Sequence, residues 1–165
     1  MSGSPSPTAR PSPSPVRQFA LIAGIIYVLA GLSGFLMFRP FWTPADVDRD
    51  PTLTVDLFYG RALMLFPVNI LHNFVHLGIG VWGLLSYRTA DGARVFARGL
   101  AILYIVLAIL GAIPATRTLF GLVPLHSHDI WLHAGTAAIA GYFAFASGRH
   151  VRTDVTNAPP PAAGI

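Results

Sequence analysis

Four long apolar stretches, separated by shorter polar segments, dominate the 165-residue chain. They lie at about residues 19–38, 66–87, 96–115 and 130–147. A helix needs about 20 predominantly apolar residues to cross the hydrocarbon core of a bilayer. The pattern therefore predicts an all-α integral membrane protein with four transmembrane helices. Arg98 lies in the first turn of the third stretch, where its side chain can extend to the headgroups. Because this charge makes the third stretch the least clean of the four, the alternative is a three-span protein without that helix.

The two ends of the chain differ in composition from this apolar middle. Residues 1–16 are rich in Ser and Pro, and the segment 149–165 carries three consecutive prolines. Such segments bury too little apolar surface to fold by themselves. We therefore expect disordered cytoplasmic tails on both sides of one transmembrane domain at residues 17–148.

The distribution of arginine predicts the orientation in the membrane. Seven of the eleven Arg residues fall on one side of the four stretches: Arg10, Arg17, Arg88, Arg94, Arg98, Arg149 and Arg152. The other side carries the remaining four Arg and four of the Asp residues. Cytoplasmic loops carry an excess of positive charge. We therefore expect both termini in the cytoplasm and the segments 39–65 and 116–128 outside.

Composition narrows the class of protein further. Only 11% of the residues are charged and 53% are hydrophobic, and all the basic residues are Arg. Arg without Lys, with abundant Ala, Gly and Pro, is typical of GC-rich bacterial genomes. Together with the four apolar stretches, this composition predicts a multi-pass protein of the bacterial inner (plasma) membrane.

The charge of the chain bears on its partners. The pI near 10.1 reflects Arg residues that flank the helices, and no segment outside the helices is long enough for a nucleic-acid-binding module. The expected partners are the lipid bilayer and either a second copy or another membrane-complex subunit. The chain has no Cys, which excludes thiolate catalysis and Cys-type zinc sites.

The chain contains an internal repeat. In the second and fourth stretches, Pro67, His72, His76 and Gly78 recur 57 residues later as Pro124, Asp129, His133 and Gly135. In the first and third stretches, Arg17, Phe19, Ala20, Tyr27 and Gly34 recur 77 residues later as Arg94, Phe96, Ala97, Tyr104 and Gly111. This pattern predicts a duplicated two-helix hairpin. Because both copies would enter from the same side, their pseudo-twofold axis should lie along the membrane normal.

Polar residues share one face in each of two predicted helices. The second helix carries Asn69, His72, Asn73 and His76, and the fourth carries Asp129, His133 and Thr136. Residues spaced by three, four and seven positions share one helix face. Both helices descend from the outer side, so the repeat places the two faces at one depth. We also expect these helices to approach closely through Gly78 and Gly135, since small residues mark tight contacts in membranes.

These faces support several hypotheses. The first is a structural or accessory membrane component whose His, Asn and Asp side chains form a polar core of interhelical hydrogen bonds, with Asn69, Asn73 and Thr136 as members. The second is a redox or hydrolytic protein with a divalent metal bound by His72, His76, Asp129 and His133. The third is a haem b held by His76 and His133 as axial ligands. A proton or solute pathway is a further alternative. No sequence motif identifies a catalytic residue, and whether the protein is an enzyme stays open.

Two segments resemble a known family. They are Asn69-Ile70-Leu71-His72-Asn73-Phe74-Val75-His76-Leu77-Gly78 and Asp129-Ile130-Trp131-Leu132-His133. They are similar to segments of the DUF4383 family, small and mostly bacterial four-helix membrane proteins of unknown function. The resemblance covers about residues 17–147. In the second segment, Ile130 stands where the family pattern has Asn. The resemblance implies the four-helix topology and adds no activity.

Overall fold

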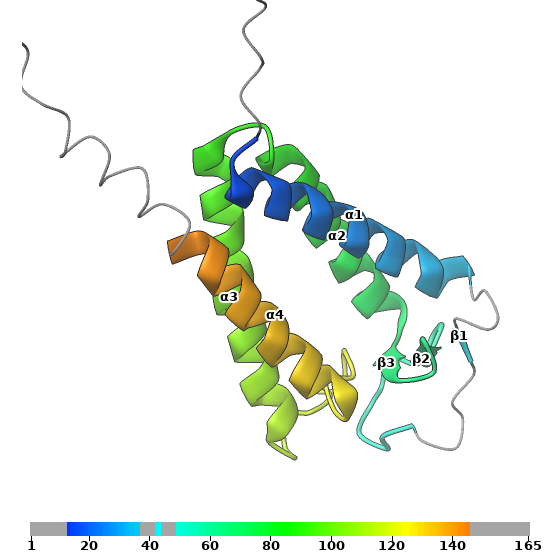
Figure 1. The fold of residues 1–165 in the computed structure, drawn as a ribbon. Helices are drawn as coiled ribbons and strands as arrows, with labels where there is room; N and C mark the ends of the chain where they lie inside the picture. The colour runs from blue at the N-terminus through cyan, green and yellow to red at the C-terminus, as the bar shows by residue number, and fades with distance from the viewer. Residues whose placement is uncertain (1–12, 37–41, 44–48, 146–165) are drawn as a thin grey trace, which may run out of the picture.

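Four α-helices and a small antiparallel sheet make up the structure (Figure 1). The computed structural model describes residues 13–36, 42–43 and 49–145. The helices are α1 (Pro15–Leu36), α2 (Ile70–Ser86), α3 (Ala90–Ala112) and α4 (His128–Phe145), and the strands are β1 (Trp42–Thr43), β2 (Gly60–Ala62) and β3 (Phe66–Val68). The strands pair in the order β1-β2-β3. The helical fold class is confirmed. Both predicted tails lie outside the described residues, apart from the segment 13–16.

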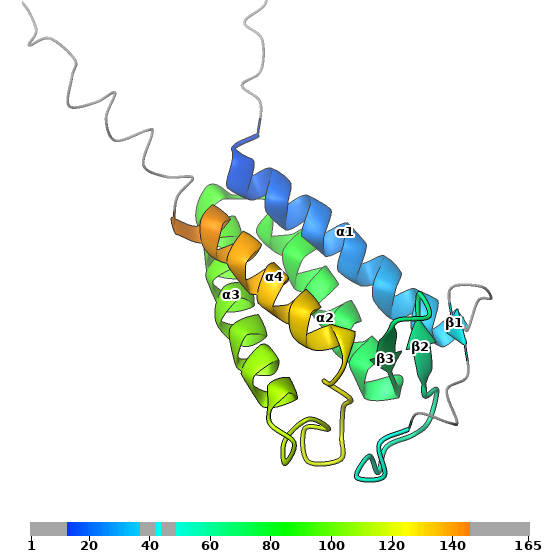
Figure 2. The same ribbon diagram turned by 60° about the horizontal axis from the view of Figure 1, so that its bottom comes forward.

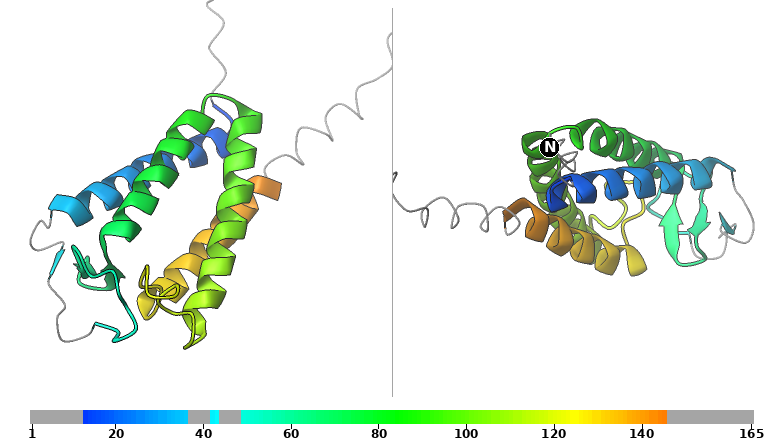
Figure 3. Two further views of the ribbon diagram at one scale, coloured as in Figure 1. Left: turned by 180° about the vertical axis from the view of Figure 1, so that it is seen from behind. Right: turned by 45° about the horizontal axis from the view of Figure 1, so that its top comes forward.

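The helices are arranged as two hairpins. Helix α1 packs along α2, and α3 packs along α4. The hairpins meet at the short connection between α2 and α3 and diverge toward the opposite end (Figure 3). The three strands lie beside the far end of the first hairpin, and the segment 113–127 closes the far end of the second (Figure 2). The packed core therefore concentrates where the hairpins meet.

Small residues let the helices approach each other in this core. Ala20, Ala93, Ala97 and Ala140 are fully buried, and Phe96 fills the space between them. The same cluster includes Val16, which the sequence analysis assigned to the disordered tail. That boundary was wrong by two residues, because Pro15 begins α1 and proline is well suited to the first position of a helix.

Glycine contacts hold α1 against α2, but they are not the ones expected from the sequence. A Cβ atom on Gly80 would lie 2.6 Å from the Val28 nitrogen, and one on Gly24 would lie 2.8 Å from the Leu84 nitrogen. By contrast, a Cβ on Gly78 or Gly135 would meet nothing within 4 Å. The predicted contact between α2 and α4 through these two glycines is therefore wrong. Both are exposed, on helix faces turned away from the neighbouring helices.

Helix α2 begins later than its hydropathy predicted. Residues Phe66–Val68 form β3 instead of a first helical turn, and the N-cap is Asn69. Its side chain accepts a hydrogen bond from the His72 backbone nitrogen at 3.0 Å. Its amide donates to the carbonyl oxygens of Val55 at 2.7 Å and Leu122 at 2.6 Å. Asn69 thus caps α2 and joins the connections of both hairpins.

A second set of contacts joins the same two connections. The buried Asp50 carboxylate accepts hydrogen bonds from the Thr52 backbone nitrogen and hydroxyl and pairs with the Arg117 guanidinium at 2.5 Å. The Thr52 and Thr118 hydroxyls lie 3.0 Å apart. Burial raises the pKa of Asp50, but the Thr52 hydrogen bonds and Arg117 outweigh it, so its pKa is lowered. These contacts hold the diverging ends of the hairpins at a fixed separation.

Helices α1 and α3 are long and apolar enough to cross a membrane. Only 28% and 33% of their most apolar windows are buried inside the structure. A helix in the core of a soluble protein would be mostly buried. The other two helices also carry exposed large apolar side chains, such as Phe74 and Val81 on α2 and Trp131 and Ile139 on α4. This exposure favours a lipid environment.

We expect Gly80→Ala to destabilise the first hairpin and Gly78→Ala, on the same helix, to leave it intact. The added methyl group at Gly80 would collide with the α1 backbone, at a cost of about 1–3 kcal/mol. At Gly78 it meets open space, so the change should be neutral or stabilising by up to about 1 kcal/mol. Thermal unfolding in detergent measures both. Equal destabilisation by the two variants would contradict the observed packing of α1 on α2.

We expect the Asp50 contacts to make stability depend on pH in the acid range. A carboxylate with a lowered pKa stabilises the fold above its ordinary pKa of 3.8, and this contribution is lost as the pH falls through the lowered value. Asp50→Asn should destabilise the protein by about 1–3 kcal/mol at neutral pH and flatten this acid dependence. Unfolding measured from pH 7 to pH 2 tests this. If the variant lost stability at low pH as steeply as the wild type, Asp50 would not be the cause of the pH dependence.

Candidate metal centre

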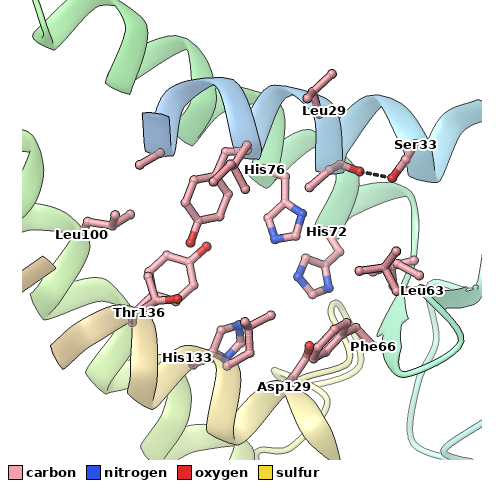
Figure 4. Close-up of a pocket in the computed structure, with 18 of the residues that line it drawn as sticks. Leu29, Ser33, Leu63, Phe66, His72, His76, Leu100, Asp129, His133 and Thr136 are labelled. Carbon is pink, nitrogen blue, oxygen red and sulfur yellow. Dashed lines mark hydrogen bonds between the residues drawn. The ribbon is translucent and has the colours of Figure 1, made fainter. Parts of the chain in front are cut away.

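A cavity of about 630 Å³ lies between the two hairpins. All four helices and the β2–β3 hairpin contribute to its walls. Figure 4 shows His72 and His76 extending into it from one side, and Asp129 and His133 from the opposite side. The cavity therefore contains all four residues that the sequence repeat singled out.

Three of these residues form a compact cluster. One ring nitrogen each of His72 and His133 and one carboxylate oxygen of Asp129 lie within 4.8 Å of one another. A metal ion at about 2.1 Å from each ligand atom needs separations of no more than about 4.2 Å. Contraction of the cluster by roughly half an ångström, within the reach of small side-chain rotations, would satisfy this geometry.

The cluster is deeply buried and short of hydrogen bonds. His72, Asp129 and His133 are 4%, 1% and 2% exposed. Within the described part of the chain, His72 Nδ1, His133 Nδ1 and Asp129 Oδ2 have no hydrogen-bond partner. An unpaired carboxylate is costly in an apolar interior unless a cation or a donor compensates it. Each of the three clustered residues thus keeps a polar atom that the described part of the protein does not satisfy.

Local structure explains how these residues meet. His72 lies in the first turn of α2, where its backbone nitrogen is held by the Asn69 cap. Asp129 and His133 are four residues apart on α4, so both side chains lie on the same face of that helix. Because α2 and α4 both start at the diverging ends of the hairpins, their first turns face each other across the cavity (Figure 4).

His76, the fourth predicted metal ligand, lies next to the cluster and outside it. Its ring packs on His72 with centroids 4.5 Å apart and on Tyr27 at 5.4 Å. His133, which stands 57 residues after His76 in the sequence, packs on Tyr104 at 5.0 Å. Tyr27 and Tyr104 line the cavity beside both histidines. The sequence analysis did not assign these tyrosines to the site, although both recur at equivalent positions of the repeat.

The remaining predicted polar residues take different places. Thr136 lines the cavity together with Tyr27. Asn73 is 1% exposed and packs against Gly34 of α1. Neither polar atom of its amide has a partner among the described residues. Asn69 is the α2 cap already described and does not line the cavity. The predicted polar face is thus divided between three environments.

The segment that leads into α4 adds two further histidines. His126 is half-buried, and His128 is exposed and lies 3.2 Å from the Ser127 hydroxyl through its Nδ1. Burial lowers the pKa of His126; the nearby Asp50 carboxylate opposes this shift, while Arg117 and Arg61 add to it. Neither histidine is part of the three-residue cluster.

Comparison with known proteins identifies the family without an activity. No curated protein and no solved structure matches the chain. The family model of a domain of unknown function, DUF4383, matches residues 17–146. This range contains all four helices except the first two residues of α1, together with the whole cluster. The chain therefore belongs to the DUF4383 family.

Proposed function

We propose that this protein is an integral membrane protein that binds a divalent transition metal through His72, Asp129 and His133. The observation that carries the proposal is the convergence of three buried ligand groups, two of them imidazoles and one a carboxylate. Imidazole and carboxylate ligands suit zinc, iron and manganese. Since thiolate ligands are absent from the sequence, the softer copper(I) and iron–sulfur sites are disfavoured.

The missing hydrogen bonds favour a metal centre over a purely structural polar core. Side chains that fix helix packing do so by bonding to each other or to backbone groups. Here His72, Asp129 and His133 each keep a buried polar atom without such a bond among the described residues. A metal ion at the cluster would compensate the carboxylate and add bonds that the protein does not supply. The structural-core hypothesis therefore ranks second.

The number of protein ligands determines whether a metal bound at the cluster could also bind water or a substrate. Three protein ligands leave coordination positions open for water or a substrate, as in catalytic zinc sites and two-His-one-carboxylate iron sites. A metal held in this way can activate a bound oxygen atom as a Lewis acid. The cavity beside the cluster has room for such a substrate. Hydrolytic and redox chemistry both fit this coordination.

Haem b is the third candidate, with His76 and His133 as axial ligands. The cavity between the two residues supports it, because its walls are mainly apolar side chains. Each histidine also packs on a tyrosine of its own hairpin. Haem binding requires His76 and does not require His72 or Asp129, whereas the metal centre requires both of the latter.

We further infer that the protein spans the membrane four times as a duplicated hairpin, with both termini in the cytoplasm of a bacterial cell. Equivalent residues of the repeat make equivalent contacts. Tyr27 packs on His76 as Tyr104 packs on His133. The two tyrosines also pack on each other across the junction, with ring centroids 5.7 Å apart. Such contacts are expected when two copies face each other about a pseudo-twofold axis.

A third equivalent contact supports the same inference. A Cβ atom on Gly34 would collide with the Asn73 amide, and one on Gly111 would collide with the Leu125 carbonyl oxygen and lie 3.3 Å from Ile130 Cγ1. Gly34 and Gly111 are matched by the repeat in the first and third helices, and Asn73 and Ile130 by the repeat in the second and fourth. Ile130 is also the position at which this chain departs from the expected family pattern. A family member with Asn there would make the repeat closer still.

We expect purified full-length protein, stripped with chelator, to bind about one equivalent of zinc or cobalt. His72→Gln, Asp129→Asn and His133→Gln should each weaken binding by more than about 100-fold, beyond the 10–100-fold loss typical of outer-shell partners. His128→Gln, next to the cluster and exposed, is the matched control and should bind normally. Metal content per folded protein, after equilibration at fixed free metal, measures the effect.

The same samples separate the alternatives. Haem would give a Soret band that His76→Gln and His133→Gln remove and His72→Gln retains. A wild type with neither metal nor haem, and cluster variants of near-native stability, would leave the structural core as the function of these residues.

We expect single-cysteine variants to report the proposed topology cleanly, because the native chain has no Cys. Asp56 is exposed in the outer connection, and Asp91 is exposed in the first turn of α3. In intact cells, Asp56→Cys should react with an impermeant maleimide, whereas Asp91→Cys should react only after permeabilisation. The reverse pattern would invert the topology, and equal protection of both would argue against four spans.

A further inference from the structure

The mouth of the cavity opens between α1 and α4 and is rimmed by apolar side chains. Five helical residues line the cavity and are also 45–60% exposed: Ile22, Ile26, Leu29, Leu132 and Ile139. The first three lie on α1, which is long and apolar enough to cross the bilayer. In the proposed topology these side chains face lipid. The cavity would then open sideways into the hydrocarbon region and not toward water.

The apolar tip of the β2–β3 hairpin lies at one edge of this opening. Leu63 lines the cavity and is 54% exposed, and its neighbour Met64 is 60% exposed. Both have left-handed backbones, with φ of 51° and 60°. Non-glycine residues in this conformation are strained and are found at ligand-binding sites more often than elsewhere. Polar turn residues would be usual here, so the tip is suited to contact with an apolar molecule.

Polarity changes from the mouth to the inner end of the cavity. The mouth is aliphatic, whereas the interior presents the three-residue cluster together with His76 and Thr136 (Figure 4). Tyr104 also lines the cavity. Among the described residues that line it there is no Arg or Lys. A phospholipid phosphate would therefore find no cationic side chain to pair with. The volume of about 630 Å³ is in the range of sites that enclose one small molecule.

We propose that the cavity binds a single-chain lipid with a small oxygen-containing head group, of the fatty-acid class. The molecule enters from the bilayer between α1 and α4, keeps its chain against the aliphatic mouth, and places a head-group oxygen at an open position of the metal. This proposal rests on the proposed metal centre for the head-group contact. The chain-binding part rests on the cavity alone.

The test uses a photoreactive C16 fatty acid and full-length protein in lipid nanodiscs. Ile26 lines the mouth, while its neighbour Ile25 is 45% exposed and is not among the lining residues. Wild type and Ile25→Trp should show saturable labelling that excess oleate removes. Ile26→Trp, in which the indole fills the mouth, should lose at least fivefold of that labelling and still bind cobalt. Equal saturable labelling of both variants would overturn the proposal.

A second readout separates this proposal from the metal centre. In cobalt-loaded wild type, oleate should change the visible cobalt spectrum, and it should not do so in Ile26→Trp. An unchanged wild-type spectrum at saturating oleate would overturn the contact between head group and metal. If wild type bound no cobalt, the metal proposal would fail, and the labelling difference between Ile25→Trp and Ile26→Trp would then decide the lipid site alone.

Discussion

The buried carboxylate of Asp129 is the constraint around which the rest of the structure is organised. It is 1% exposed, lies beside the rings of His72 and His133, and keeps one oxygen without a hydrogen bond in the described part of the chain. A negative charge in such surroundings is unfavourable unless something compensates it. The divalent cation proposed above would compensate the charge once the three ligands move slightly closer together. The other elements of the fold can be understood as the frame that brings these three side chains together.

The frame works by combining tight packing within each hairpin with separation between them. Glycines 24 and 80 bring the backbones of α1 and α2 into contact, while Phe96 and small residues join the hairpins at one end. At the other end, hydrogen bonds of Asn69 and the ion pair of Asp50 join the α1–α2 connection to the α3–α4 connection, and the space between the helices stays open. The result is a cavity held open by polar contacts outside the proposed membrane region. A cavity of this kind suits binding better than it suits stability, because unfilled volume weakens packing.

Sequence reasoning located the four helices and singled out residues that the structure brings together in one cavity, for identifiable reasons. Hydropathy and the repeat depend on local composition, so they located four helices and matched His72 with Asp129. The start of α2 was missed because Phe66–Val68 is as apolar as a helix but pairs with β2, a non-local contact. His76 and His133 stand at matching positions in the sequence, and each packs on a tyrosine, yet only His133 joins the cluster. Side-chain packing of this kind is not encoded in residue spacing.

X-ray absorption spectroscopy of the zinc-loaded wild-type protein tests the central claim most directly. The account predicts a first coordination shell of nitrogen and oxygen at about 2.0–2.2 Å, with outer-shell scattering from two imidazole rings. Loss of one imidazole in His133→Gln would assign the signal to the cluster. A zinc shell made only of oxygen, or one unchanged in that variant, would contradict the account and place any bound metal elsewhere.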